Sequence, residues 1–354
     1  MPEFRPEALS RILQRILVAA GATPAEAETV ASLGIDAHLS GHDSHGTLSL
    51  LGYVNKISNG EVVPGAQVEV IRETGSTLVL DGNWGFGHVV VREATLRGIR
   101  KAREAGTCVV SVRHCNHLGR LSDYLRMVTG EGMAAIMMAN AHGQRGLAAA
   151  FGGIDPRLST NPMGVGVPTG GTPLILDMTT TVAAGGKVAL AHNLGEPVPD
   201  GWLIDSRGRP TNDPGVILED PPGSLLPLGG PVGYKGFGLG LAVEALAGAL
   251  SGAGCTDWDR IRGGNAVFLN VINVASFARP EIFHAQMQGF LERIKASPRA
   301  PGFDEIRIPG EREARERQRR RREGIVLPRA TWREVLAVAN DLGLDLENHE
   351  DESS

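Results

Sequence analysis

Two histidines in short polar segments are the first residues that could do chemistry. His45 follows Asp43 and Ser44 and lies between the two glycines of GHDSHG, where a hydroxyl or a carboxylate could hold its ring beside a cleft. His117 follows shortly after the apolar run TCVVSV, where α/β enzymes display catalytic groups at strand ends. Histidine titrates near neutral pH and is the commonest group in general acid–base catalysis. Each histidine could instead be an ordinary surface or turn residue, and neither segment alone decides between these interpretations.

Further along the chain, other groups could hold an anion or orient a histidine. Arg120 and Lys235 stand beside glycines and could bind a carboxylate or a phosphate, although Lys235 could equally be a solvated loop residue. Asp177 in LILDM could orient a histidine or bind a ribose, or it could cap a turn. Residues 308–310 precede a charged segment whose helical N-terminus could receive an anion. A proton donor, a carboxylate site and a cofactor cradle are what hydride transfer to a carbonyl requires.

Several well-known motifs are absent, and their absence narrows the chemistry. The sequence contains no GxGxxG, so a dinucleotide would have to bind without the usual glycine turn between strand and helix. It contains no GxSxG and no Walker loop, which disfavours hydrolases and phosphotransferases. His114 and His117 could join His142 or Cys115 as metal ligands, but no glutamate or third histidine stands at a recognised spacing. We therefore predict that the protein binds no metal.

The composition favours a soluble, cytoplasmic enzyme. The chain has 354 residues, 42% of them hydrophobic, which is enough for a sizeable core or two unequal lobes. A formal net charge of −5 argues against nucleic acid, because phosphate binding favours a basic face. Three cysteines without a CxxC spacing predict neither a zinc ribbon nor a disulfide framework, and the first residues lack a signal-peptide pattern. No stretch reaches the roughly 18 apolar residues of a membrane span. We expect a small-molecule substrate, no nucleic acid and no membrane.

The elements that must position these residues alternate between helices and strands. A hairpin is expected over residues 67–82, and helices followed by strands are expected over residues 94–112 and 121–140, an alternation that favours an α/β fold. Residues 151–240 are rich in glycine and proline and indicate loops that approach a ligand closely. A buried helix is expected over residues 239–252 and a late strand over 265–273.

Helices are also predicted at both ends of the chain. Apolar residues recur at helical spacing over residues 9–20, and Thr23, Pro24 and Glu26 begin a second helix that runs to about Leu39. Thr331 and Glu334 predict another capping box near the C-terminal end. The basic run 312–322 is interpreted as a solvated helical face, with Glu311–Arg315 and Glu316–Arg320 pairs at i,i+4.

Taken together, the motifs resemble those of the malate/L-lactate dehydrogenase family, NAD(P)-dependent enzymes that lack a Rossmann fold. The resemblance runs nearly end to end and rests on GHDSHG, LDGNWGFGH, NHLG, TNPMGVGVP, LDMTTT, DSRGRPTNDP, GYKGFGLGLAVEALAGALSG and PGE, which occur in this order. It implies a non-Rossmann α/β fold, a homodimer, and NAD or NADP as cofactor. We expect residues 1–75 and 275–345 to form a helical substrate lobe, residues 76–274 to form the cofactor lobe, and residues 346–354 to be a disordered tail.

The resemblance also assigns roles to single residues. It implies that His45 and His117 are the acid–base candidates, with His45 slightly favoured, that Ser44 orients His45, and that Asp177 lies beside the nicotinamide. His45 also falls among the residues implied to contact the dinucleotide. The others are Leu118, Gly119, Arg120, Asp177, Met178, Thr179, Lys235, Asn265, Pro309, Gly310 and Glu311.

One position departs from the family pattern. Many members carry an arginine for the substrate carboxylate a few residues after SHG, whereas this chain has Ser49 there. GHDSHG and HLGRL are closer to the hydroxycarboxylate dehydrogenase branch, whose members reduce 2-oxo acids with bulkier, sometimes aromatic, side chains. We hypothesise that Arg120, with Lys235, replaces the missing cation, and that Ser49 contacts the substrate. The alternatives are reduction of a cyclic imine carboxylate and a catalytically silent binding protein of the same fold.

Overall fold

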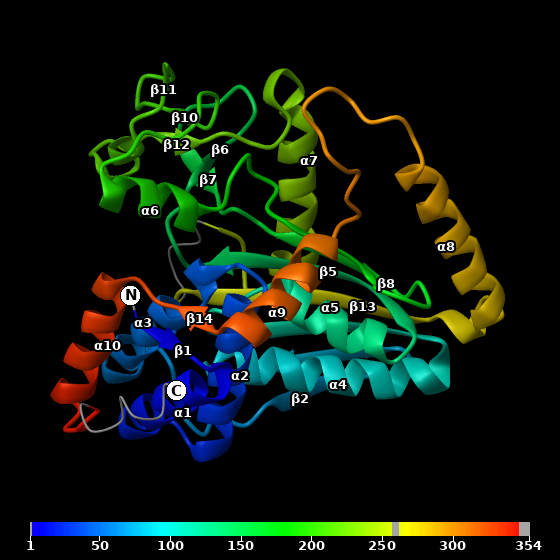
Figure 1. The fold of residues 1–354 in the computed structure, drawn as a ribbon, viewed down its shortest axis with the longest axis horizontal. Helices are drawn as coiled ribbons and strands as arrows, with labels where there is room; N and C mark the ends of the chain where they lie inside the picture. The colour runs from blue at the N-terminus through cyan, green and yellow to red at the C-terminus, as the bar shows by residue number, and fades with distance from the viewer. Residues whose placement is uncertain (1, 257–261, 347–354) are drawn as a thin grey trace.

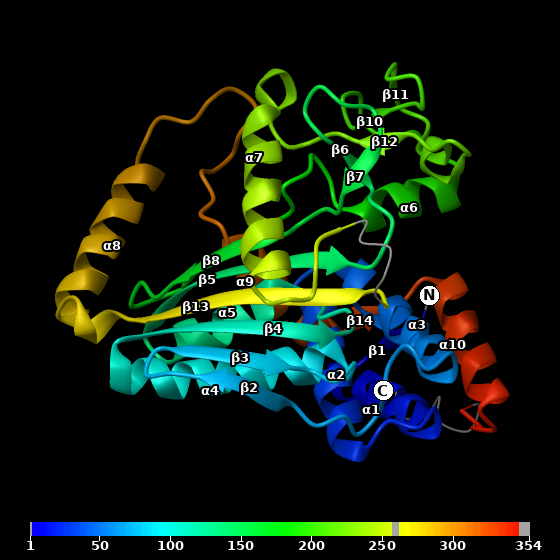
Figure 2. The ribbon, with the colours of Figure 1, turned by 180° about the vertical axis from the view of Figure 1, so that it is seen from behind.

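A twisted seven-stranded sheet lies at the centre of the protein, with helices on both sides (Figures 1 and 2). The computed structural model describes residues 2–256 and 262–346. Within those residues, no helix is both long and apolar enough to cross a membrane. The sheet has the order β2-β3-β4-β13-β5-β8-β9. Its strands are β2 (Glu69–Glu73), β3 (Thr77–Asp81), β4 (Thr107–Cys115), β5 (Met133–His142), β8 (Met163–Val167), β9 (Leu174–Met178) and β13 (Gly264–Asn273).

The late strand β13 completes the middle of this sheet. It pairs antiparallel with both β4 and β5, placing Asn265 opposite Cys115 and Gly264 opposite His142. The predicted hairpin forms as β2 and β3, and the predicted strands after residues 106 and 132 form as β4 and β5. Since β4, β5 and β9 run in the same direction, their carboxyl ends lie at one edge of the sheet.

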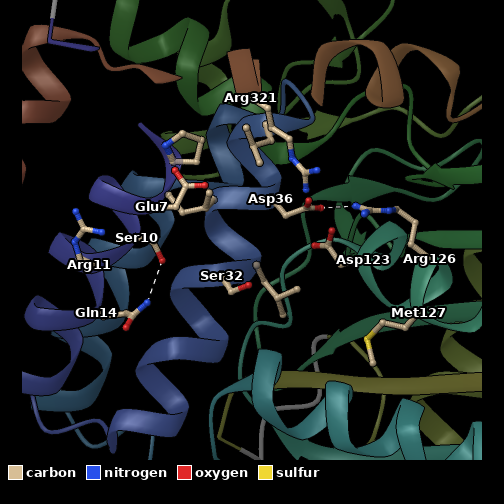
Figure 3. Close-up of a pocket in the computed structure, with 14 residues that line it drawn as sticks. Glu7, Ser10, Arg11, Gln14, Ser32, Asp36, Asp123, Arg126, Met127 and Arg321 are labelled. Carbon is tan, nitrogen blue, oxygen red and sulfur yellow. Dashed lines mark hydrogen bonds and ion pairs between the residues drawn. The ribbon is translucent and has the colours of Figure 1, made fainter. Parts of the chain in front are cut away.

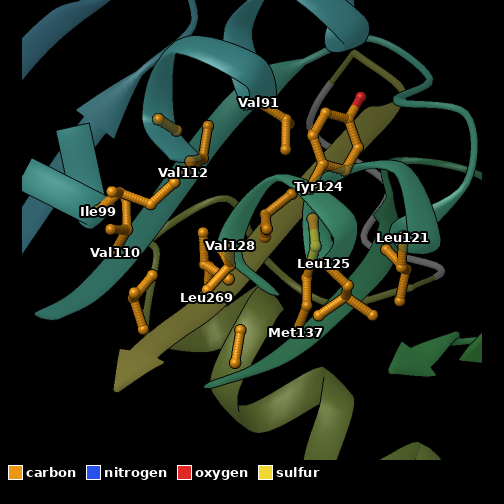
Figure 4. Close-up of a cluster of buried hydrophobic side chains, with 14 of the residues drawn as sticks. Val91, Ile99, Val110, Val112, Leu121, Tyr124, Leu125, Val128, Met137 and Leu269 are labelled. Atoms are coloured by element: carbon orange, nitrogen blue, oxygen red, sulfur yellow. The ribbon is translucent and has the colours of Figure 1, made fainter. Parts of the chain in front are cut away.

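One face of the sheet is covered by α4 (Gly87–Ala105) and α5 (Leu121–Gly130). Alternate residues of β4 and β13, including Val110 and Leu269, point into this core, where they meet Tyr124 and Leu125 of α5 (Figure 4). Complete burial of such a side chain stabilises the fold by roughly 1.5–3 kcal/mol. The predicted apolar helix lies elsewhere on the sheet, as α7 (Tyr234–Val243) continued by a π-helical turn, η4 (Glu244–Ala249).

Helices from both chain ends share a second core. It is built from α1 (Pro6–Ala19), α2 (Pro24–Leu39), α3 (Thr47–Ser58), α10 (Arg329–Asp341), and the short strands β1 (Glu3–Phe4) and β14 (Ile325–Val326). The capping box of α2 is confirmed, because Thr23 Oγ1 accepts from the Glu26 amide and the Glu26 carboxylate accepts from the Thr23 amide. The box predicted at Thr331 is wrong. Helix α10 begins two residues earlier, after Pro328, so Thr331 is already inside it and makes no cap bond.

A third, smaller core lies within the glycine-rich part of the chain. It contains α6 (Gly185–Leu194) and a five-stranded sheet of β6 (Ala148–Ala149), β7 (Pro156–Leu158), β10 (Leu203–Ile204), β11 (Pro210–Thr211) and β12 (Ser224–Leu225). Helix α8 (Pro280–Lys295) stands apart from the chain-end helices and buries none of its described side chains (Figure 2).

The predicted boundaries of the two lobes stay a prediction. Residues 347–354 of the predicted tail lie outside the described residues, whereas Leu346 is buried in the second core.

The basic run forms helix α9 (Glu311–Glu323), as predicted. The Glu316–Arg320 pair is confirmed at 2.7 Å. The Glu311–Arg315 pair is wrong, because Glu311 binds Lys295 at 2.5 Å and Arg315 binds Glu305. The helix is also not merely a solvated face. Arg317 of α9 binds Asp36 of α2, and its side chain is only 14% exposed.

Candidate functional site

His45 lies in a single 3₁₀ turn, η1 (Asp43–His45), between α2 and α3. Its ring is half-buried, and its Nδ1 lies 3.1 Å from Ser44 Oγ, the contact expected if Ser44 orients the ring. The pKa of His45 is lowered to about 4, first by burial and then by the nearby charge of Arg120. His45 is therefore a neutral imidazole near pH 7.

The turn that carries His45 is fixed by a buried histidine of α2. His38 Nε2 accepts from the Thr47 amide at 2.9 Å, so its Nδ1 donates to Asp43 at 2.8 Å. A Cβ atom at Gly46 would lie 2.2 Å from His38 Nε2, so only glycine fits there. The pattern GHDSHG is thus explained locally by the packing of the His38 ring.

His117 reaches the same place from the carboxyl edge of the sheet. It lies in the loop between β4 and α5, and its ring stacks on His45 with centroids 5.9 Å apart and planes at 25°. Its Nδ1 lies 2.6 Å from the hydroxyl of Tyr53, a buried residue of α3. Burial lowers the pKa of His117 well below its usual range, and His45, His88 and Lys56 lower it further. The structure therefore brings the two predicted acid–base residues together, both as neutral rings.

Two side chains that the sequence did not single out complete this cluster. His88 of α4 is fully buried, its ring meets Tyr53 edge-on at 5.5 Å, and burial lowers its pKa to about 3. Tyr53 lies eight residues after His45, in helix α3. The i,i+4 spacing of Ser49 and Tyr53 in TLSLLGYV was the available signal, since it places two hydroxyls on one helical face.

The loop of residues 116–120 is held by side-chain amides. Asn116 Oδ1 accepts from Lys56 Nζ at 3.1 Å and from the His117 amide at 2.8 Å. Asn265 Oδ1 accepts from the Leu118 amide at 3.2 Å, so strand β13 also positions the loop. A Cβ atom at Gly87 would lie 2.1 Å from the Asn116 carbonyl oxygen, which shows how closely α4 approaches the loop.

Arg120, at the end of this loop, is buried in an ion cluster. Its guanidinium binds Asp123 and also donates to Asp36 at 3.1 Å. Asp36 in turn accepts from Arg126 at 2.5 Å and from Arg317 of α9 at 2.9 Å. These contacts speak against the hypothesis that Arg120 holds the substrate carboxylate, because its donors already bind two carboxylates.

A cavity of about 980 Å³ opens beside this ion cluster, between α1, α2 and α5 (Figure 3). Charges of both signs line it, among them Asp36, Arg126 and Arg321. Neither His45 nor His117 is among the lining residues. The cavity is therefore separate from the histidine site.

Several of the segments implied to hold the dinucleotide lie beside β9 and the residues that follow it. Asp177 is exposed near the end of β9, where its carboxylate accepts from the Ser122 amide at 2.8 Å and so caps the first turn of α5. The Ile175 amide donates to the Pro309 carbonyl at 3.0 Å, which brings residues 309–311 beside β9. Met178 and Thr179 follow Asp177 and are half-buried.

The remaining predicted contacts lie on neighbouring segments. Lys235 is exposed in the first turn of α7, and the adjacent Gly236 amide donates to Leu228, which itself donates to Thr180. Gly119 and Gly310 have φ angles of +80° and +98°, which favour glycine. Glu311 accepts from the Ile308 amide at 3.1 Å, within the turn that opens α9. The contact of these residues with a dinucleotide stays a prediction.

The other histidines considered as metal ligands lie beside Trp84. His114 lies 2.9 Å from Asp81 and stacks on Trp84 with centroids 5.0 Å apart. His142 is fully buried beside the same tryptophan. In the part of the chain that the structure describes, no three His, Cys, Asp or Glu residues are grouped to hold a metal ion.

Ser49 lies one turn before Tyr53 on α3, and its hydroxyl donates to the Tyr53 oxygen at 3.5 Å. At Ser49, where the family resemblance led us to expect an arginine, the side chain is therefore a hydroxyl that points toward Tyr53, the partner of His117. Its predicted contact with the substrate stays a prediction.

Comparison with known proteins agrees with this arrangement. The sequence model of the malate/L-lactate dehydrogenase family matches residues 4–336. Hydroxycarboxylate dehydrogenase B of Escherichia coli is 34% identical over 347 residues, which cover 96% of this chain and 94% of that protein. Malate dehydrogenase of Entamoeba histolytica superimposes with a TM-score of 0.91 at 29% identity, covering 98% of this chain and 99% of that one. Δ1-piperideine-2-carboxylate reductase of Pseudomonas syringae superimposes with a TM-score of 0.83 at 28% identity, covering 96% of this chain and 100% of that one. The chain belongs to the malate/L-lactate dehydrogenase family and is an oxidoreductase of the 2-hydroxy acid dehydrogenase type.

Proposed function

We propose that the protein interconverts a 2-oxo acid and a 2-hydroxy acid with NAD(P)H or NAD(P)⁺. The observation that carries this proposal is the stacked pair His45 and His117, with His117 in the loop that follows β4. When bound, the dinucleotide supplies the hydride to the carbonyl carbon, or accepts it in the reverse direction. The protein's own task is then to hold the substrate, exclude water and supply a proton to the carbonyl oxygen.

The histidine rings suit the proton transfer, because both are neutral and each has a hydroxyl partner. Ser44 lies beside the His45 Nδ1, and Tyr53 lies beside the His117 Nδ1, which leaves the Nε2 of each ring for the substrate. Asp177 and Lys235 are assigned to the dinucleotide, with residues 118–120, 178–179, 265 and 309–311 around it. Arg120 orders this region through its ion pairs rather than as a free cation.

Several dehydrogenases in the family act on different acids, so the side chain of the substrate is best found by experiment. The departure at Ser49 favours a bulky or aromatic 2-oxo acid over malate or lactate. Reduction of a cyclic imine carboxylate is the second candidate, favoured by the structural likeness to the piperideine carboxylate reductase. A C=N substrate is often already protonated, so its reduction depends less on the histidines.

The proposal includes a homodimer. Helix α7 exposes Tyr234 and Leu241, and α8 exposes Ile282 and Phe290, each of them more than 45% accessible. These exposed apolar side chains on two helices support an interaction surface. Light scattering after size exclusion should give twice the 37.4 kDa mass of the chain, and a single-chain mass would reject the dimer.

The test of the function is oxidation of NADH and NADPH, followed at 340 nm, with pyruvate, oxaloacetate, phenylpyruvate and a cyclic imine carboxylate. Turnover of one 2-oxo acid that is lost in both His45→Ala and His117→Ala supports the proposal. Turnover of the imine alone favours the second candidate. If nothing is turned over and nicotinamide fluorescence shows no cofactor binding, a catalytically silent protein of the same fold is indicated.

A further inference from the structure

A chain of hydroxyl groups leads to the buried side of the His117 ring. Tyr53 is 2% exposed, and its hydroxyl lies 2.6 Å from His117 Nδ1. Ser49 Oγ donates to the Tyr53 hydroxyl at 3.5 Å from one helical turn earlier. Ser49 is itself only half-buried. The order Ser49, Tyr53, His117 thus leads from a half-buried residue to the His117 ring.

The surroundings of His117 raise a difficulty for simple acid catalysis. Burial and the neighbouring groups His45, His88 and Lys56 all disfavour a positively charged ring. A neutral imidazole that gives its Nε2 proton to the substrate would be left as an anion, which burial also disfavours. The difficulty disappears if Nδ1 receives a proton while Nε2 loses one.

We propose, building on the function proposed above, that Ser49 and Tyr53 form a proton relay that reprotonates His117 at Nδ1 as Nε2 protonates the substrate. As the hydride reaches the carbonyl carbon, the Nε2–H bond breaks and the substrate O–H bond forms. The Tyr53 O–H proton moves to Nδ1, the Ser49 proton moves to the Tyr53 oxygen, and Ser49 regains a proton from bulk solvent, which supplies the one proton that the reduction consumes. The ring stays neutral and ends in its other tautomer, and the reverse transfers occur during oxidation of the alcohol.

The packing around Tyr53 supports this direction of the hydrogen bonds. Burial raises the pKa of Tyr53 above its ordinary value, so the hydroxyl keeps its proton and can donate it. Because this hydroxyl accepts from Ser49, its own proton is directed to His117 Nδ1. The Tyr53 ring is held edge-on by Phe86 and His88, at 6.2 and 5.5 Å. Phenylalanine at position 53 would keep these contacts and remove only the hydroxyl.

The relay predicts a graded loss of turnover with the best 2-oxo acid of the panel. Tyr53→Phe should lower kcat by ~10 to 100-fold and Ser49→Ala by roughly 10-fold, less than the ~10² to 10⁴-fold that loss of the general acid itself would cost. The KM for the cofactor should stay unchanged. Ser49→Thr keeps a hydroxyl and should restore kcat, and Ser58→Ala, at the exposed end of the same helix, serves as the matched control.

Solvent isotope effects distinguish a relay from simple support of the ring. In mixtures of H₂O and D₂O, several protons in flight should make kcat of the wild type depend on the deuterium fraction along a curve. In Ser49→Ala, the dependence should become closer to a straight line. If Ser49→Ala had the same kcat and the same solvent isotope effect as the wild type, the relay would be overturned.

The tautomer of His117 tests the relay independently of turnover. In the protein with ¹⁵N-labelled histidine, two-bond ¹H–¹⁵N correlation spectra should show a protonated Nε2 and a bare Nδ1, assigned by the loss of signals in His117→Gln. Tyr53→Phe should shift this tautomer and Ser49→Thr should not. A protonated Nδ1 in the wild type would overturn the relay. If no 2-oxo acid is turned over, the proposed function fails, and the tautomer alone then decides the relay.

Discussion

The loop of residues 116–120 separates two regions with opposite electrostatics. On one side, His117 is a neutral ring whose Nδ1 meets a tyrosine hydroxyl. On the other side, Arg120 lies between the carboxylates of Asp36 and Asp123, with further arginines around them. A neutral imidazole can exchange one tautomer for the other without a net change in charge, whereas a buried ion pair resists any change in charge. Chemistry and rigidity are therefore assigned to different groups only three residues apart.

The histidine side of the comparison carries the largest expected effect. His117→Ala should lower kcat by roughly 10² to 10⁴-fold, because the proton donor is removed. Nicotinamide fluorescence should show that cofactor affinity is kept. His192→Ala, an exposed histidine of α6, should leave kcat unchanged. If His117→Ala kept full activity, the proton would have to come from His45.

On the charged side, Asp36→Asn should reduce stability rather than chemistry. The change leaves Arg120, Arg126 and Arg317 without their shared carboxylate, at a cost of about 3 kcal/mol in the free energy of unfolding. Urea denaturation measures this loss, with Glu28→Gln on the exposed face of the same helix as control. Equal midpoints for the two variants would show that the cluster contributes no net stability.

The buried, neutral His88 beside the catalytic pair should affect how the free energy of unfolding depends on pH. The pKa of His88 falls from 6.5 to about 3 on folding because the ring is buried. Between these values the unfolded chain binds more protons, so the free energy of unfolding falls as the pH falls. The wild type should therefore lose stability faster than His88→Phe between pH 5.5 and 4, by about 1.4 kcal/mol per pH unit for one proton. Parallel curves from urea titrations would contradict a neutral, buried His88.

The smallest effect is expected for a single arginine of the cluster. Arg317→Gln should cost about 1 kcal/mol, because Asp36 keeps two arginine partners. The same urea titrations measure it, and kcat should not change. A loss as large as that of Asp36→Asn would mean that α9, and not the carboxylate, holds the cluster together.

The sequence predicted elements whose signals are local. The capping box at Thr23, the hairpin around residues 69–81 and the strand after residue 106 each depend on neighbouring residues, and each was found. The box at Thr331 failed because the helix already begins at Arg329, with Pro328 as its N-cap residue. The stacked arrangement of His45 and His117 is also compatible with the roles that the family resemblance implied.

The surroundings of Arg120 and Tyr53 depend on distant contacts. Arg120 stands beside a glycine in the sequence, which is typical of anion sites, but Asp36 binds it from 84 residues away. Tyr53 meets His117 across 64 residues, so no short motif joins them. Such pairings are set by how α2 and α3 pack against the loop, and a single sequence carries no direct record of that packing.

The place of β13 in the sheet has a consequence for how the enzyme is made. Since this strand lies between β4 and β5, the sheet stays open at its centre until residue 273 has left the ribosome. The same strand brings Asn265, which holds the amide of Leu118 next to His117. His45 and His117 are therefore synthesised long before β13 can position the loop that carries His117. We expect activity to arise late in synthesis, once β13 has paired with β4 and β5.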